Sequence, residues 1–135
     1  GGPIGRWLIR RYNFFANTIM KAAYGDKRRL TPEIHRHYLM ALAEPDERKG
    51  CWVLPKQIIG ASDWLADLWS RRDALDDKVR LIAWGLKDVA FREKELNRWT
   101  DSFPDARVVR WADAGHFAAD EISTALIAEM LEMLA

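Results

Sequence analysis

The sequence predicts an α/β fold in which an all-helical first half is followed by a strand, helix, strand, helix unit with parallel strands. Over residues 1–75 the apolar side chains recur at helical spacing. From Val79 onward, two short runs of β-branched and aromatic residues alternate with helical stretches. A length of 135 residues, of which 49% are hydrophobic, is enough to build a packed core.

Two helices are predicted before residue 45. Apolar spacing indicates one helix over Ile4–Tyr24, which Gly25 would end. A second helix should begin at Thr31, because a capping hydroxyl is followed by Pro32, whose fixed φ suits the first turn, and by Glu33, whose charge suits the positive helix end. The buried face of this second helix is expected to consist of Ile34, Tyr38 and Leu42.

A polar loop and two apolar stretches complete the helical half. Residues 45–50 form the predicted loop, and the apolar segment Trp52–Ile59 is expected to be broken by Pro55. A further helix is predicted over Ser62–Arg71. Its inward face would carry Trp64, Leu65, Leu68 and Trp69.

The second half is expected to hold two strands. The first is predicted over Val79–Trp84, ending at Gly85, and the second over Arg107–Trp111. A helix over residues 91–103 separates them, so the strands should be parallel and joined by a right-handed crossover. A final helix is indicated by a stripe of Ile122, Leu126, Met130 and Leu134.

Two parallel strands make an incomplete sheet, because parallel strands are normally buried on both faces within larger sheets. The chain also starts at Gly1 without an initiating methionine. We therefore expect a further half of the protein upstream, and we expect the exposed sheet edge to pair with that half or with another copy of this chain.

Composition and charge exclude several classes of function. Lys and Arg number 21 against 20 Asp and Glu, for a net charge of +1, so no nucleic-acid partner is expected. No apolar stretch approaches the roughly 20 residues that span a bilayer, and no signal-peptide pattern opens the chain, so no membrane association is expected. The sole cysteine, Cys51, cannot form an internal disulfide, which is typical of a cytoplasmic protein.

Candidate chemistry lies in the loops that follow the two predicted strands. The carboxyl ends of neighbouring parallel strands lie about 4.8 Å apart at one side of a sheet, so Asp88 and His116 should emerge side by side. A carboxylate bonded to one imidazole nitrogen leaves the other free to accept a proton. Asp113 is an alternative partner, but it is more plausibly a turn residue. Gly85 and Gly115 suit tight turns, because glycine tolerates backbone angles closed to other residues.

The segments LIAWGLKDVAF, RWTDSFPDARVVRWADAGHF and DE, between Leu81 and Glu121, closely resemble the last third of haloalkane dehalogenases and related epoxide hydrolases. In that α/β-hydrolase family the acid lies in a G-x-x-D turn after a strand, matched by residues 85–88, and the histidine lies in a D-A-G-H-F-type loop, matched by residues 113–117. The resemblance implies that Asp88 and His116 are the acid and the base of a catalytic triad. It further implies that residues 1–75 belong to a helical cap, and residues 76–135 to the C-terminal part of the core.

The resemblance also implies a nucleophile outside this chain, because the family's order is nucleophile, acid, histidine and no nucleophile elbow or oxyanion motif occurs here. In dehalogenases an aspartate displaces halide to give an alkyl ester, which water activated by His116 would hydrolyse; in esterases of the same fold a serine takes that place. A small apolar organic substrate is implied. No cofactor or metal is expected, since a triad needs neither, and this chain alone should be inactive.

Other chemistry-bearing residues are weaker candidates. Cap tryptophans in some dehalogenases donate an indole N–H to the halide, but core packing is favoured for each tryptophan of the helical half. These are Trp7, Trp52, Trp64 and Trp69. His35 and His37 lack the helical spacing of a metal pair and are expected on a solvated surface, while Cys51 is expected to be a buried structural thiol. The basic clusters at residues 10–11 and 27–29 are expected to be solvated helix ends.

Overall fold

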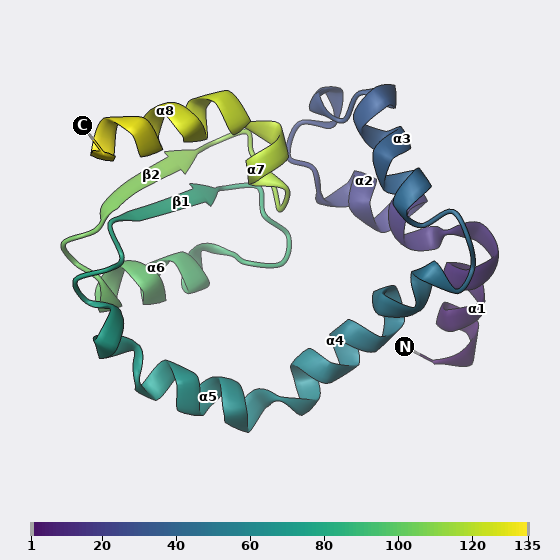
Figure 1. The fold of residues 1–135 in the computed structure, drawn as a ribbon, viewed down its shortest axis with the longest axis horizontal. Helices are drawn as coiled ribbons and strands as arrows, with labels where there is room; N and C mark the ends of the chain where they lie inside the picture. The colour runs from purple at the N-terminus through teal and green to yellow at the C-terminus, as the bar shows by residue number, and fades with distance from the viewer. Residues whose placement is uncertain (1, 135) are drawn as a thin grey trace. The chain divides into compact units, whose positions relative to one another are not determined.

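The computed structural model describes residues 2–134, which divide into two compact units (Figure 1). The helical unit consists of residues 2–22 and 30–71, and the sheet unit consists of residues 23–29 and 72–134. The segment 23–29 therefore packs with the sheet unit, although it lies within the helical half of the sequence. Among the helices described, none is both long enough and apolar enough to cross a bilayer.

Short helices build the first unit, and its predicted helical character is confirmed. They are α1 (Pro3–Tyr12), a π-helical stretch (Phe15–Ile19) continued by α2 (Met20–Ala23), α3 (Pro32–Ala41), α4 (Gly50–Gly60) and α5 (Ser62–Ser70). The predicted start of α3 is also confirmed. Thr31 Oγ1 accepts a hydrogen bond of 3.2 Å from the backbone N–H of Ile34, and Pro32 is the first helical residue.

The single helix predicted over Ile4–Tyr24 is wrong, because the chain leaves the α-helical conformation at Asn13. Asn13 has φ 47°, in the left-handed region that asparagine enters more easily than most residues. Its side-chain Nδ2 donates to the carbonyl of Leu42 at 3.0 Å. A partner 29 residues away thus stabilises the break, and local apolar spacing carries no sign of it.

Two expectations for the segment from Trp52 to Arg71 are also wrong. Pro55 lies inside α4 instead of breaking it, although proline removes one backbone donor and crowds the carbonyl of the preceding turn. The predicted inward face of α5 is largely open: Trp64 is 60% exposed, and Leu65 and Leu68 are also exposed. Only Trp69 of that face is half-buried. Within the described residues, the helical unit provides too little packing surface for this face.

The sheet unit has the predicted order of elements. Strands β1 (Leu81–Gly85) and β2 (Arg107–Trp111) pair in parallel, with Leu81 opposite Arg107 and Gly85 opposite Trp111. β1 starts at Leu81 instead of the predicted Val79. The remaining helices are α6 (Glu93–Ser102), α7 (Ala118–Glu121) and α8 (Ser123–Leu134). The predicted final helix corresponds to α8, which begins one residue after Ile122, and the side chain of Leu134 lies outside the described part.

The core of the sheet unit lies between β1 and α6. It consists of the buried residues Ile82, Leu96, Phe103 and Ala106. The ring of Trp99 stacks on that of Phe103, with centroids 5.5 Å apart. Helices α6 and α8 lie on opposite sides of the strand pair (Figure 1). This packing fixes β1, and therefore the loop that follows it.

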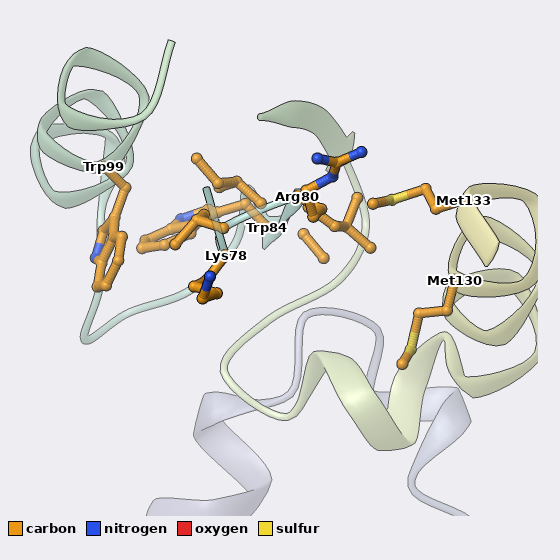
Figure 2. Close-up of a pocket in the computed structure, with 10 residues that line it drawn as sticks. Lys78, Arg80, Trp84, Trp99, Met130 and Met133 are labelled. Atoms are coloured by element: carbon orange, nitrogen blue, oxygen red, sulfur yellow. The ribbon is translucent and has the colours of Figure 1, made fainter. Parts of the chain in front are cut away.

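An apolar groove of about 800 Å³ runs along β1 (Figure 2). Residues 78–84 line its length, with Trp99 of α6 on one side and Met130 and Met133 of α8 on the other. One edge of β1 pairs with β2, and no third strand is present in residues 2–134. The groove therefore follows the unpaired edge of the sheet.

Candidate active site

The loops after β1 and β2 bring Asp88 and His116 together, as the sequence predicts. Both carboxylate oxygens of Asp88 lie 3.1 Å from Nδ1 of His116. The loops are tied to each other by backbone bonds, from Leu86 N–H to the carbonyl of Trp111 and from Lys87 N–H to the carbonyl of Ala114, both 2.9 Å. The juxtaposition therefore follows from parallel pairing that continues beyond the strand ends.

The Asp88 carboxylate is held in place by its own loop. Its Oδ1 accepts hydrogen bonds from the backbone N–H groups of Ala90 at 2.7 Å and Phe91 at 2.9 Å. The indole Nε1 of Trp84 donates to the carbonyl of Phe91 at 3.2 Å, which ties the same loop to β1. These bonds orient the carboxylate toward the imidazole.

The hydrogen bond to Asp88 determines which nitrogen of His116 is free to accept a proton. An ionised carboxylate only accepts hydrogen bonds, so the neutral imidazole carries its proton on Nδ1 and leaves the lone pair of Nε2 available. The His116 side chain is 35% exposed, whereas that of Asp88 is 11% exposed. Phe91 stacks on the imidazole at 5.6 Å and Phe117 meets it edge-on at 5.5 Å. A shielded carboxylate thus orients an accessible imidazole.

Asp113, the alternative partner, does not contact His116 in this arrangement. Its Oδ1 forms an ion pair of 3.2 Å with Nζ of Lys87. Both side chains are exposed, so this pair contributes little to stability. The preference for Asp88 over Asp113 as the neighbour of His116 is confirmed.

Glycines are required near the site for a reason other than the predicted one. No described glycine has a positive φ. A Cβ on Gly85 would instead lie 2.6 Å from the carbonyl oxygens of Ala114 and Gly115. A Cβ on Gly115 would lie 2.4 Å from the carbonyl oxygen of Ala23. Close approach of three backbone segments, and not special backbone angles, excludes side chains here.

The segment 23–29 and Glu121 are parts of the site that the sequence does not reveal. The backbone N–H of His116 donates to the carbonyl of Ala23 at 2.9 Å. The buried carboxylate of Glu121 accepts hydrogen bonds from the N–H groups of Gly25, Asp26 and Gly115. The contacts with Ala23, Gly25 and Asp26 are long-range, and the local signal is an acidic residue next to the apolar stripe of the last helix.

The other candidate histidines and Cys51 lie in the helical unit. His35 is not a solvated residue as predicted: it is half-buried, with Nε2 3.0 Å from the carbonyl oxygen of Ala16. His37 is exposed, as expected. Cys51 is half-buried instead of fully buried, and burial raises the pKa of its thiol. No group of three or more metal-binding side chains occurs within the described range.

The tryptophans of the helical unit differ in exposure. Trp52 is buried, and the guanidinium groups of Arg6 and Arg10 lie over its ring at 5.3 and 5.9 Å. Trp7 is exposed, as Trp64 is, so the predicted core packing is wrong for both within this unit.

Of the basic clusters, Arg10 pairs with Asp46, and the exposed Arg28 pairs with Asp26.

Comparison with known proteins gives relatives along most of the chain, although no family model matches it. The chain is 36% identical over 131 residues to proteins named haloalkane dehalogenase 2 from Mycobacterium tuberculosis and Mycobacterium bovis, which covers 93% of this chain and 45% of theirs. It is 25% identical over 129 residues to a cis-3-alkyl-4-alkyloxetan-2-one decarboxylase from Xanthomonas campestris, which covers 92% of this chain and 42% of that protein. The chain thus spans less than half the length of these curated relatives.

Proposed function

We propose that this chain is a C-terminal portion of an α/β-hydrolase fold, similar to haloalkane dehalogenases, and that the protein carrying it is a hydrolase that uses Asp88 and His116. The observation that supports the proposal best is the pair itself, with Nδ1 of His116 3.1 Å from both carboxylate oxygens of Asp88. The substrate class that fits is a small apolar organic molecule. Residues 1–75 serve as the cap in this proposal, and residues 76–135 as part of the core.

His116 acts in the second half of the proposed reaction. An aspartate of the upstream part attacks a substrate carbon, halide leaves with the bonding electrons, and an alkyl ester joins enzyme and substrate. Nε2 of His116 then takes a proton from water, and the resulting hydroxide attacks the ester carbonyl. The ester C–O bond on the carboxyl side breaks, which regenerates the aspartate and, after protonation, releases an alcohol. Asp88 stabilises the imidazolium that forms.

Replacement of His116 by Gln tests this assignment in the full-length protein. The first step needs no general base, so we expect the ester to form and then accumulate, while steady-state turnover of haloalkanes falls by about 10³-fold or more. Intact-mass measurement after substrate addition would detect the trapped adduct. A variant with Gln in place of His37, which is exposed in α3, serves as the control and should turn over normally. Undiminished turnover in the His116 variant would contradict the proposal.

The alternative within the same fold is a serine esterase or an epoxide hydrolase. The Asp88–His116 pair supports each of these, because all of them need a base that activates water or a nucleophile. The upstream nucleophile separates them: serine gives an acyl ester and aspartate an alkyl ester. Incubating full-length protein with an ester, an epoxide and a haloalkane, and measuring the mass of each adduct, distinguishes the three chemistries.

We further propose that the unpaired edge of β1 receives another strand of the full-length protein. Three observations support this. An apolar groove follows that edge, α6 and α8 line it from two sides, and the matched relatives are more than twice as long as this chain. Parallel strands are buried in larger sheets, which a third strand would begin to restore. Pairing with a second copy of the chain is the outcome expected when the rest of the protein is absent.

A further inference from the structure

We propose that Glu121 is a positioning residue, which holds the loop that carries His116 through backbone hydrogen bonds. Glu121 is the last residue of α7 and is only 7% exposed. Its Oε1 accepts from the N–H of Gly115 at 2.8 Å and from that of Gly25 at 3.1 Å, while Oε2 accepts from Gly25 at 3.0 Å and from Asp26 at 2.9 Å. One side chain therefore joins two segments that are 90 residues apart in sequence.

The chemistry of the contact explains why a buried carboxylate is stable there. Removing a carboxylate from water is costly unless hydrogen bonds replace its hydration. Backbone N–H groups of three residues supply that replacement for Glu121. These N–H groups are satisfied at the same time, which matters because buried backbone donors without a partner are also costly. The loop and the segment 23–26 are therefore linked through a single group.

His116 is fixed from both sides by this arrangement. Its own backbone N–H donates to the carbonyl of Ala23, and the residue before it, Gly115, donates to Glu121. The backbones are in such close contact that a Cβ on Gly25 would lie 2.5 Å from the backbone N of Gly115. If Glu121 released the loop, the imidazole would move relative to Asp88, and their 3.1 Å contact would lengthen.

The catalytic consequence depends on the proposed function, but the positioning itself can be measured without turnover. In the full-length protein, Glu121→Gln keeps the size of the side chain and replaces one acceptor oxygen with an NH₂ donor, which would face backbone N–H groups. We expect the downfield NMR signal of the His116 Nδ1–H, which reports its bond to Asp88, to weaken or shift upfield. We also expect kcat to fall by roughly 10- to 100-fold with little change in KM.

Asp120→Asn is the matched control. Asp120 is the neighbouring carboxylate in α7, it is exposed, and it accepts a hydrogen bond from the hydroxyl of Tyr24. The NMR signal of His116 should be the same in this variant as in the unmodified protein. An unchanged His116 signal in Glu121→Gln, or an equal change in Asp120→Asn, would overturn the proposal. A changed signal in a protein that shows no hydrolase activity would refute the proposed function alone.

Hydrogen exchange can be measured on the unmodified protein, so this test does not depend on whether a variant folds. If Glu121 links the two segments, the amides of Gly25, Asp26, Gly115 and His116 should open together, with similar protection factors. Exchange of the Gly115 amide that is much faster than, and independent of, exchange of the Gly25 amide would overturn the proposal.

Discussion

At the scale of single residues, buried polar groups in this chain are held by backbone groups of distant segments. Asn13 and Arg48 illustrate this in the helical unit, where both are buried: Asn13 donates to the carbonyl of Leu42 at 3.0 Å, and Arg48 donates to the carbonyl of Arg10. Glu121 does the same in the sheet unit, but as an acceptor from the N–H groups of Gly25 and Asp26. Such groups set the course of irregular segments, because a buried polar atom without a partner is costly.

A prediction at this scale concerns Asp26, which lies in the segment next to the His116 loop. Hydrogen bonds from the side chain and backbone of Arg28 hold the pKa of the Asp26 carboxyl well below its usual value of 3.8. The Arg28 interactions therefore favour the folded state above pH 3.8, and this contribution is lost as the pH falls below that value. In Arg28→Ala we expect the pKa of Asp26 to rise toward 3.8, as measured by carboxyl NMR titration.

Arg29→Ala is the control for this titration. The Nε of Arg29 lies 3.9 Å from the same carboxylate, compared with 2.8 Å for Nη2 of Arg28. The pKa of Asp26 should therefore rise less in Arg29→Ala than in Arg28→Ala. Equal rises would contradict a dominant role for the hydrogen bonds from Arg28.

At the scale of elements, helix ends were more predictable than helix interiors. The start of α3 has a local cause, since the Thr31 hydroxyl caps a helix whose first residue is Pro32. The break between α1 and the π-helical stretch has a distant cause in the bond from Asn13 to Leu42. Pro55, a strong local signal, was overridden within α4. In these three places, local chemistry predicted where a helix begins but did not predict whether a helix continues.

The hydroxyl of Thr31 that caps α3 is expected to contribute to the stability of the protein. Thr31→Ala removes the acceptor for the N–H of Ile34, and we expect the free energy of unfolding to fall by about 1 kcal/mol. Urea denaturation followed by circular dichroism measures the change. Thr31→Ser keeps an acceptor oxygen and should retain most of the stability. A loss in the Ser variant as large as that in the Ala variant would show that the hydroxyl does not cap the helix.

At the scale of the whole molecule, open apolar surface is the dominant feature. The groove along β1 and the exposed residues of α5, Trp64, Leu65 and Leu68, belong to different units. Large exposed apolar patches are uncommon on monomeric proteins and typically mark contact surfaces. For the groove, the proposed contact is a strand at the unpaired edge of β1.

Proline substitution at that edge tests the proposal. The N–H of Arg107 donates to the carbonyl of Arg80, and the N–H of Leu86 donates to the carbonyl of Trp111. The backbone N–H and C=O groups of the even-numbered residues of β1 therefore point toward β2, and the N–H of Ala83 points toward the open edge. We expect this chain alone to self-associate reversibly in sedimentation-velocity experiments, and Ala83→Pro to weaken the association. Ala83→Thr, which keeps the N–H, is the control. A monomer at high concentration would contradict pairing between copies.

The sequence by itself determined the order of elements, the parallel strand pair and the adjacency of Asp88 and His116. These follow from local periodicity and from the rule that parallel strands open their loops on one side, so they need no knowledge of distant contacts. The catalytic role of the pair stays a prediction.

Only the tertiary structure decided how the His116 loop is held and where the first helix breaks. Glu121 reaches Gly25, and Asn13 reaches Leu42, across 96 and 29 residues. The close backbone approach at Gly85 and Gly115 is also a tertiary feature, because it depends on which segments meet and not on the residues beside each glycine. Hydrogen bonds between remote segments leave no periodic pattern in a sequence, so folding had to bring those segments together before their partners could be identified.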